Sequence, residues 1–168
     1  MRDLHVSWDE YNRLIEKLAL KVWESGWRFD AIVCIARGGL RIGDVFSRLF
    51  DRPLGVVFTS SYREDEGLRR GELHIGEHLA SAGPLPGPNW LIVDDLVDSG
   101  TTLVQLVPAL RARHPQAKEL RTAVLWRKGA SIAEPDYAVE QLPSNPWIHQ
   151  PFEEYDHMRP SDLKVRWG

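Results

Sequence analysis

Three carboxylates and four small residues stand close together between residues 94 and 102. Asp94 and Asp95 are adjacent, and Asp98 follows three residues after Asp95. The next residues are three hydroxyl side chains and a glycine: Ser99, Gly100, Thr101 and Thr102. Backbone amides in such a turn can converge on one anion, such as a phosphate. Carboxylates beside a bound phosphate would repel it, so they are normally accompanied by a cation or by sugar hydroxyls. The spacing therefore predicts a site for a phosphorylated sugar with Mg²⁺.

The residues on either side of this turn predict the elements that position it. Residues 90–93 are apolar and indicate a short buried strand, and apolar residues recur at helical spacing from Leu103 to Leu110. We therefore expect the adjacent carboxylates at the carboxyl end of a strand and the amides of residues 99–102 at the positive end of a helix. An acidic turn whose hydroxyls only cap the helix is the alternative, but it does not explain so many acidic and small residues in one turn.

A second turn of similar character follows an apolar run at residues 31–36. Arg37, Gly38 and Gly39 come directly after that run, and helical spacing resumes at Leu40. Two glycines let the backbone approach a ligand closely, and Arg37 adds a fixed positive charge, so a pyrophosphate group would fit this turn. The turn is neither a Walker loop nor a dinucleotide-binding loop, because it lacks the Gly-Lys-Ser/Thr sequence of the first and the glycine spacing of the second.

These two turns resemble ligand-binding loops of one enzyme family. The segment from Asp94 to Thr102 resembles the phosphoribosyl diphosphate (PRPP) motif of the type I phosphoribosyltransferases, in which a hydrophobic strand, two acidic residues and a Gly-Thr turn follow one another. The turn from Ala36 to Gly39 is similar to the pyrophosphate loop of the xanthine-guanine members, which often contains a cis peptide bond that does not involve proline. The resemblance covers the chain from about Val6 to Asp156.

A third similarity concerns the purine pocket of that family. A Trp-Ile pair, here Trp147 and Ile148, is followed by proline, aromatic and acidic residues. The family's lysine that contacts the purine 6-oxo group corresponds to Lys128, which follows an apolar segment at residues 120–126. Family members commonly have a proline after this lysine, whereas this chain has a glycine, so Arg127 could share or replace the contact.

The resemblance implies an Mg²⁺-dependent transferase of purine salvage. It would transfer ribose 5-phosphate from PRPP to xanthine, guanine or hypoxanthine, and it would release pyrophosphate and a nucleoside monophosphate. Asp98 would act as general base, while Asp94 and Asp95 would hold ribose hydroxyls directly or through the metal ion. The other site residues would bind the 5′-phosphate (Ser99, Gly100, Thr101 and Thr102), pyrophosphate (Arg37, Gly38 and Gly39) and the base (Lys128, Trp147 and Ile148).

The order of apolar segments predicts an α/β fold with a parallel sheet flanked by helices, as the resemblance also implies. We expect one domain over residues 1–168, with a flexible active-site loop at about 63–89, a small base-binding hood at about 140–156 and a tail of uncertain order at 158–168. Three helices are predicted: one at residues 8–24, one that begins at residue 40, and one from about residue 103 to about residue 113. Strands are predicted at residues 31–36, 54–59, 90–93, 120–126 and 137–139.

Composition excludes several classes of protein. The 168 residues are 43% hydrophobic, which is typical of a globular chain, and a net charge of −3 argues against a general nucleic-acid binder. Cys34 is the single cysteine, so neither an internal disulfide nor a multi-cysteine metal site can form. No export segment or membrane span stands out, so we expect a cytoplasmic protein. We also expect a homo-oligomer, either a dimer or a tetramer.

Other interpretations of the sequence stay open. The same fold could bind PRPP as a regulator without turnover, or it could serve a non-purine base, in which case the Lys128 and Trp147 pair would not be needed. The residues from His74 to His78 also match the His-x-x-Glu-His pattern of inverted zinc peptidases. That chemistry requires a helix, which Gly76 disfavours, so we do not expect zinc catalysis.

Overall fold

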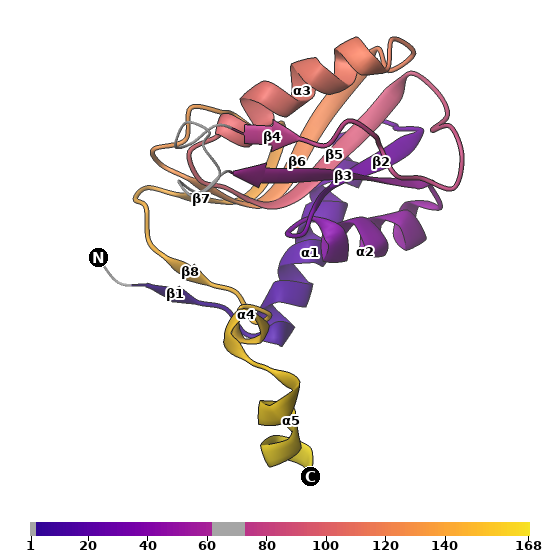
Figure 1. The fold of residues 1–168 in the computed structure, drawn as a ribbon. Helices are drawn as coiled ribbons and strands as arrows, with labels where there is room; N and C mark the ends of the chain where they lie inside the picture. The colour runs from indigo at the N-terminus through magenta and orange to yellow at the C-terminus, as the bar shows by residue number, and fades with distance from the viewer. Residues whose placement is uncertain (1–2, 62–72) are drawn as a thin grey trace.

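A sheet of mostly parallel strands forms the centre of the computed structural model, which describes residues 3–61 and 73–168 (Figure 1). Its strands are β2 (Ala31–Ala36), β3 (Leu54–Ser61), β4 (Leu73–Ile75), β5 (Asn89–Val97), β6 (Glu119–Lys128) and β7 (Tyr137–Leu142). They lie in the order β4-β3-β2-β5-β6-β7, and all neighbours are parallel except β3 and β4. The predicted parallel sheet is confirmed.

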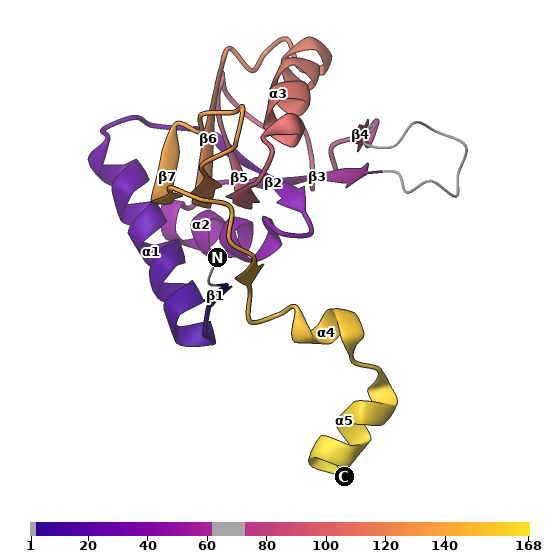
Figure 2. The same ribbon diagram turned by 90° about the vertical axis from the view of Figure 1, so that its left-hand side faces the viewer.

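Helices cover both faces of this sheet. They are α1 (Trp8–Glu24), α2 (Leu40–Phe50) and α3 (Thr101–Arg113). Helices α1 and α2 lie on one face and α3 on the other (Figures 1 and 2). Side chains of β2 alternate between the two cores, because Ile32 and Cys34 pack with the α1 and α2 side whereas Val33 and Ile35 pack with the α3 side. Burial of both faces explains why β2 is continuously apolar.

Helix α1 begins and ends where the sequence predicts. The Ser7 side chain accepts a hydrogen bond from the Glu10 amide at 3.2 Å, which satisfies one of the free amides of the first turn. Its buried stripe includes Tyr11, Leu18 and Val22, all fully enclosed. In the described part of the chain, no helix is long and apolar enough to cross a membrane.

Strand β5 is longer than predicted, and this changes the position of the acidic pair. The ladder from β5 to β2 ends at Val93, but the ladder from β5 to β6 continues as far as the pairing of Val97 with Arg127. Asp94 and Asp95 therefore lie within the strand and not after its end. The prediction of a strand limited to residues 90–93 was wrong because hydrogen bonds to β6 hold the polar residues in extended conformation. Strands β6 and β7 are likewise longer than predicted.

The segment predicted as one loop at 63–89 contains a strand. Strand β4 pairs antiparallel with the end of β3, and Ala80 makes a further bridge to Val56. The flexible loop predicted at 63–89 is therefore interrupted by β4, whose three residues are too few to show a periodic pattern. Residues 62–72, which include the first part of the predicted active-site loop, lie outside the described residues.

The hood is built from both ends of the described chain. Strand β1 (Leu4–His5) pairs in parallel with β8 (Ile148–His149). The Leu4 amide donates to the Trp147 carbonyl at 2.8 Å, and the Val6 amide donates to the His149 carbonyl at 3.0 Å. Two short helices, α4 (Glu154–His157) and α5 (Pro160–Trp167), then lead away from the body (Figures 1 and 2). Helix α5 lies in the segment 158–168, which the sequence predicted as a tail of uncertain order.

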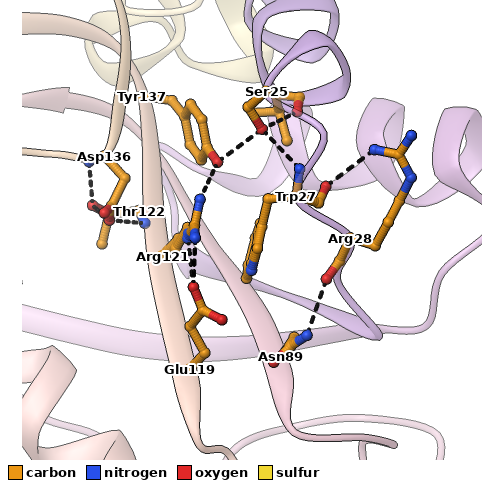
Figure 3. A network of polar contacts seen from close by, with 10 residues as sticks. Ser25, Trp27, Arg28, Asn89, Glu119, Arg121, Thr122, Asp136 and Tyr137 are labelled. Atoms are coloured by element: carbon orange, nitrogen blue, oxygen red, sulfur yellow. Dashed lines mark hydrogen bonds and ion pairs between the residues drawn. The ribbon is translucent and has the colours of Figure 1, made fainter.

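A polar network fastens the end of α1 to β6 and β7, opposite the carboxyl ends of the strands (Figure 3). The Arg121 guanidinium pairs with Glu119 at 2.6 Å, donates to the Tyr137 hydroxyl at 2.9 Å and stacks over Trp27. The Tyr137 hydroxyl lies 3.0 Å from the Ser25 hydroxyl at the end of α1. These contacts tie the amino ends of β6 and β7 to the end of α1.

Candidate active site

The turn after β2 closes directly onto β5. A Cβ on Gly38 would lie 2.5 Å from a carboxylate oxygen of Asp95, and a Cβ on Gly39 would collide with the Val93 carbonyl. Both positions therefore need glycine for this close approach. The peptide bond between Ala36 and Arg37 is cis, as the resemblance implied. The turn and the acidic pair thus form adjoining walls of one site.

Both carboxylates of the acidic pair are held by hydrogen bonds. Asp95 accepts the Leu96 amide at 2.7 Å on one oxygen and the Gln150 side-chain amide at 2.5 Å on the other. Asp94 accepts the Asp95 amide at 2.9 Å. Burial, followed by the charge of Asp95, raises the pKa of Asp94 well above its usual range. A cation beside the pair would relieve this repulsion.

The donor set of the acidic pair suits Mg²⁺ bound together with a ligand. In the described residues, no group of three or more histidine, cysteine, aspartate or glutamate side chains could hold a metal ion. Mg²⁺ commonly takes one or two carboxylates and completes its octahedron with water and phosphate oxygens. Asp94 and Asp95 fit that pattern, whereas a metal held by the protein alone would need further ligands.

The turn predicted to bind phosphate encloses a small cavity. Its volume is about 200 Å³, and it is lined by residues of the β5 end and the start of α3: Asp94, Asp95, Leu96, Val97, Asp98, Ser99, Gly100, Thr102 and Leu103. Thr101 is the one predicted phosphate-binding residue outside this lining. Its amide donates to the Ser99 hydroxyl at 3.3 Å, a local serine turn that precedes α3, whose own N-cap residue, Gly100, makes no side-chain capping hydrogen bond.

Gly100 is required by both conformation and packing. Its φ of +88° lies in the left-handed region, and a Cβ would meet the Ala133 amide at 2.5 Å and the Ser131 hydroxyl at 2.7 Å. The loop at 131–134 therefore packs against the phosphate turn. Arg127 holds that loop, since its guanidinium donates to the Ala133 carbonyl at 3.2 Å and pairs with Glu134 at 2.8 Å.

Lys128 lies on the other side of the β6 end and meets two other predicted site residues. It is only 6% exposed, and its Nζ lies 3.2 Å from Asp98 Oδ2 and 5.9 Å from the centre of the Trp147 ring. Trp147 is 60% exposed and presents its ring beside this pair. Ile148 is buried, so only its backbone is available for a ligand. The structure thus groups Lys128, Asp98 and Trp147 and leaves Arg127 apart.

Three residues at the site were missed by the sequence analysis. Gln150 is 6% exposed and binds Asp95 from the hood. The Tyr11 hydroxyl and the Gln150 Oε1 are buried without a hydrogen-bond partner within the described residues, and burial followed by the charge of Asp95 raises the pKa of Tyr11. Asp156 pairs with the exposed Arg37 at 3.2 Å. Only proximity in sequence to Trp147 could have drawn attention to Gln150.

The zinc-peptidase pattern does not form the structure that its chemistry requires. His74 lies in strand β4 and the Gly76 amide donates to the Phe58 carbonyl, so these residues are not on a helix. The two histidines are therefore not presented on one helical face.

Comparisons with known proteins agree on one family. A phosphoribosyl transferase domain model matches residues 7–157. The xanthine-guanine phosphoribosyltransferase of Idiomarina loihiensis is 31% identical over 157 residues, which cover 93% of this chain and 90% of that protein. The crystal structure of a purine phosphoribosyltransferase from Pyrococcus horikoshii superposes with a TM-score of 0.70 at 29% identity, covering 90% of this chain and 94% of that one. The Helicobacter pylori xanthine-guanine-hypoxanthine enzyme gives a TM-score of 0.77 at 25% identity over 98% and 99% of the two chains.

Replacing Gly100 with alanine should destabilise the protein. The left-handed backbone and the overlap with the 131–134 loop should together lower the free energy of unfolding by about 2–4 kcal/mol, measured by urea denaturation. Gly83→Ala is the matched control, because a Cβ added there would have no atom within 4 Å and its φ is not left-handed. A Gly100→Ala variant as stable as Gly83→Ala would contradict the described turn.

Proposed function

Because this chain belongs to the phosphoribosyl transferase family, we propose that it transfers ribose 5-phosphate from PRPP to a 6-oxopurine. The reaction releases pyrophosphate and forms a nucleoside monophosphate, so it serves the reuse of free purine bases in salvage. The observation that carries the proposal is the grouping of Lys128, Asp98 and Trp147 beside the phosphate turn. Three relatives with 25–31% identity are named as xanthine-guanine, purine and xanthine-guanine-hypoxanthine enzymes, which supports a purine as acceptor.

The PRPP molecule would extend across both turns. The 5′-phosphate binds at the start of α3, where amides of residues 99–102 and the positive end of the helix dipole meet. The pyrophosphate group lies on the Arg37 turn, and its oxygens replace the Asp156 carboxylate as the partner of the Arg37 guanidinium. The ribose lies between these two ends, beside Asp94 and Asp95.

The acidic pair would hold the ribose hydroxyls and an Mg²⁺ ion. Asp95 is oriented for this role by the Leu96 amide and by Gln150, which leave its remaining lone pairs for the ligand. When bound, Mg²⁺ supplies positive charge that balances the negative charge of the departing pyrophosphate. The chain supplies the matching fixed charge through Arg37.

Asp98 would remove the proton of the purine imidazole ring. Its side chain is 64% exposed and stands at the mouth of the phosphate cavity, where a bound base can reach it. The Lys128 ammonium balances its charge at 3.2 Å. A transition state with oxocarbenium character at the anomeric carbon needs little nucleophilic help, so orientation, charge and this proton transfer are the contributions expected of the protein.

Recognition of the base would come from β6 and β8. Lys128 donates to the 6-oxo group, and Trp147 stacks on the ring system. The Trp147 and His149 carbonyls already accept hydrogen bonds from β1. Because hydrogen-bonding groups alternate in direction along a strand, the backbone amide and carbonyl of Ile148 point away from β1. These two groups are therefore available to the 2-position of the purine. One donor and one acceptor at this edge are compatible with xanthine, guanine and hypoxanthine.

Two alternatives, a phosphoribosyltransferase for a non-purine base and a regulator that binds PRPP without turnover, differ from this proposal in the residues that they require or in their activity. A phosphoribosyltransferase for a non-purine base has no need of a buried lysine beside an exposed tryptophan, and both are present here. A regulator that binds PRPP without turnover shares the phosphate turn, so only an activity measurement separates it from an enzyme.

The purine assignment predicts a strong preference against adenine. Adenine carries a 6-amino group, which would leave the buried Lys128 without an acceptor, so kcat/KM with PRPP and Mg²⁺ should favour the best 6-oxopurine by about 100-fold or more. Lys128→Ala should remove most of that preference, whereas Lys118→Ala, an exposed lysine, should not change it. Equal kcat/KM for adenine would overturn the substrate class, and PRPP binding without any product would favour the regulator.

The role of Asp98 predicts a defect in turnover rather than in binding. Asp98→Asn should lower kcat by about 10²–10⁴-fold, as expected for loss of a general base, and should leave the dissociation constant for PRPP nearly unchanged. Asp44→Asn, at an exposed ion pair on α2, provides the control. An unchanged single-turnover rate in Asp98→Asn would exclude this role.

A further inference from the structure

The Gln150 side chain joins the hood to the acidic pair, and only one of its two ends has a partner. Its Nε2 donates to Asp95 Oδ2 at 2.5 Å, whereas its Oε1 is buried without a hydrogen-bond partner among the described residues. A reversed amide would turn its oxygen toward the Asp95 carboxylate, and two acceptors repel each other. A donor bound to Oε1 would therefore keep the amide in the orientation that serves Asp95.

The Tyr11 hydroxyl is a buried group of the complementary kind. Tyr11 lies on α1 and is fully buried, and its hydroxyl also lacks a hydrogen-bond partner in the described part of the chain. Burial, followed by the charge of Asp95, raises the pKa of this hydroxyl, so it keeps its proton and can donate. Leaving a buried hydroxyl unpaired costs free energy, so such a group in a folded protein needs an explanation.

The packing of the hood brings Tyr11 to the turn that carries Gln150. The Glu153 amide donates to the Gln150 carbonyl at 3.0 Å, so residues 150–153 form one tight turn. Within this turn, the Phe152 ring meets the Tyr11 ring edge-on, with the ring centres 5.6 Å apart. The Arg41 guanidinium lies over Phe152 at 4.8 Å and holds the turn against the start of α2. Tyr11 and Gln150 therefore border the same side of the acidic pair.

A third buried side-chain atom without a hydrogen-bond partner lies elsewhere in the described residues. It is Trp27 Nε1, and the Trp27 ring lies under Arg121 in the polar network at the other end of the strands (Figure 3). Of the two buried donors in this set, the Tyr11 hydroxyl is therefore the one that stands near Gln150 Oε1. One unpaired donor and one unpaired acceptor thus adjoin Asp95.

We propose that the Tyr11 hydroxyl donates to Gln150 Oε1 when PRPP binds, which makes Tyr11 a positioning residue for Asp95. This inference rests on the proposed function, in which Asp95 holds ribose hydroxyls and Mg²⁺. Hydrogen bonds of a site are often long or poorly aligned before the ligand binds, and they tighten in the complex. Tyr11 acts through Gln150: it fixes the amide, whose Nε2 then keeps the Asp95 carboxylate in one orientation. Partners of this kind strongly affect the affinity of a ligating carboxylate.

Titration calorimetry of PRPP with Mg²⁺, combined with urea denaturation, tests this role in Tyr11→Phe. The dissociation constant for PRPP should rise about 5-fold, as expected for loss of one hydrogen bond. The free protein should be at least as stable as wild type, because the variant removes a hydroxyl that has no partner among the described residues. Tyr155→Phe, at a half-exposed tyrosine of α4, should change neither quantity. Wild-type affinity in Tyr11→Phe would overturn the proposal, and so would a loss of stability, which would assign the hydroxyl to the fold alone.

A double-mutant cycle tests whether Tyr11 acts through Gln150. Gln150→Met keeps the length of the side chain but removes both ends of the amide, so it should raise the dissociation constant for PRPP about 10-fold or more. Gln116→Met, at an exposed glutamine after α3, is the control and should bind as wild type does. Adding Tyr11→Phe to Gln150→Met should weaken binding no further, because the hydroxyl then has no amide to fix.

The outcomes of this cycle separate the contact from the proposed function. Additive effects of Tyr11→Phe and Gln150→Met would exclude the contact between these two side chains. Failure of wild type to bind PRPP would refute the proposed function on which the contact rests. Wild-type binding that Tyr11→Phe leaves unchanged would refute the Tyr11 contact alone.

Discussion

The site depends on the close approach of the Arg37-Gly38-Gly39 turn to strand β5. Strand β2 pairs with β5 only as far as Val93, so the last residues of β5 are open on that side, and the turn closes over them. The absence of side chains at two successive glycines lets its backbone meet the Asp95 carboxylate and the Val93 carbonyl. One strand end therefore adjoins both the Arg37 turn and the turn at residues 98–102, which are the two turns proposed to bind the two ends of PRPP.

Neighbouring residues at the end of β6 have different tasks because a strand directs them to opposite sides. Lys128 meets Asp98 and Trp147, where the base is proposed to bind. Arg127 holds the 131–134 loop, against which Gly100 of the phosphate turn packs. Although no proline follows Lys128, Arg127 lies apart from the proposed base site and instead supports the turn that is proposed to bind phosphate.

Sequence alone predicted the parts of the molecule that are determined locally. Helix α1 has its capping serine and a regular apolar stripe, β2 is buried on both faces, and the two glycine-containing turns follow their strands. The length of β5 could not be read from apolar periodicity, because its polar half is held by the ladder with β6. Contacts between distant segments left no local signal. Examples are the pairing of β1 with β8, the hydrogen bond from Gln150 to Asp95, and the ion pair between Arg37 and Asp156.

The most direct test of this account is the affinity for PRPP when the close approach at Gly38 is disturbed. Equilibrium titration of PRPP in the presence of Mg²⁺ should show binding to Gly38→Ala weakened by about 10-fold or more, because the added methyl group displaces the Asp95 carboxylate. Gly83→Ala, which has open space around the added methyl group, should bind as wild type does. A Gly38→Ala variant with wild-type affinity would contradict the claim that this turn and the acidic pair form one PRPP site.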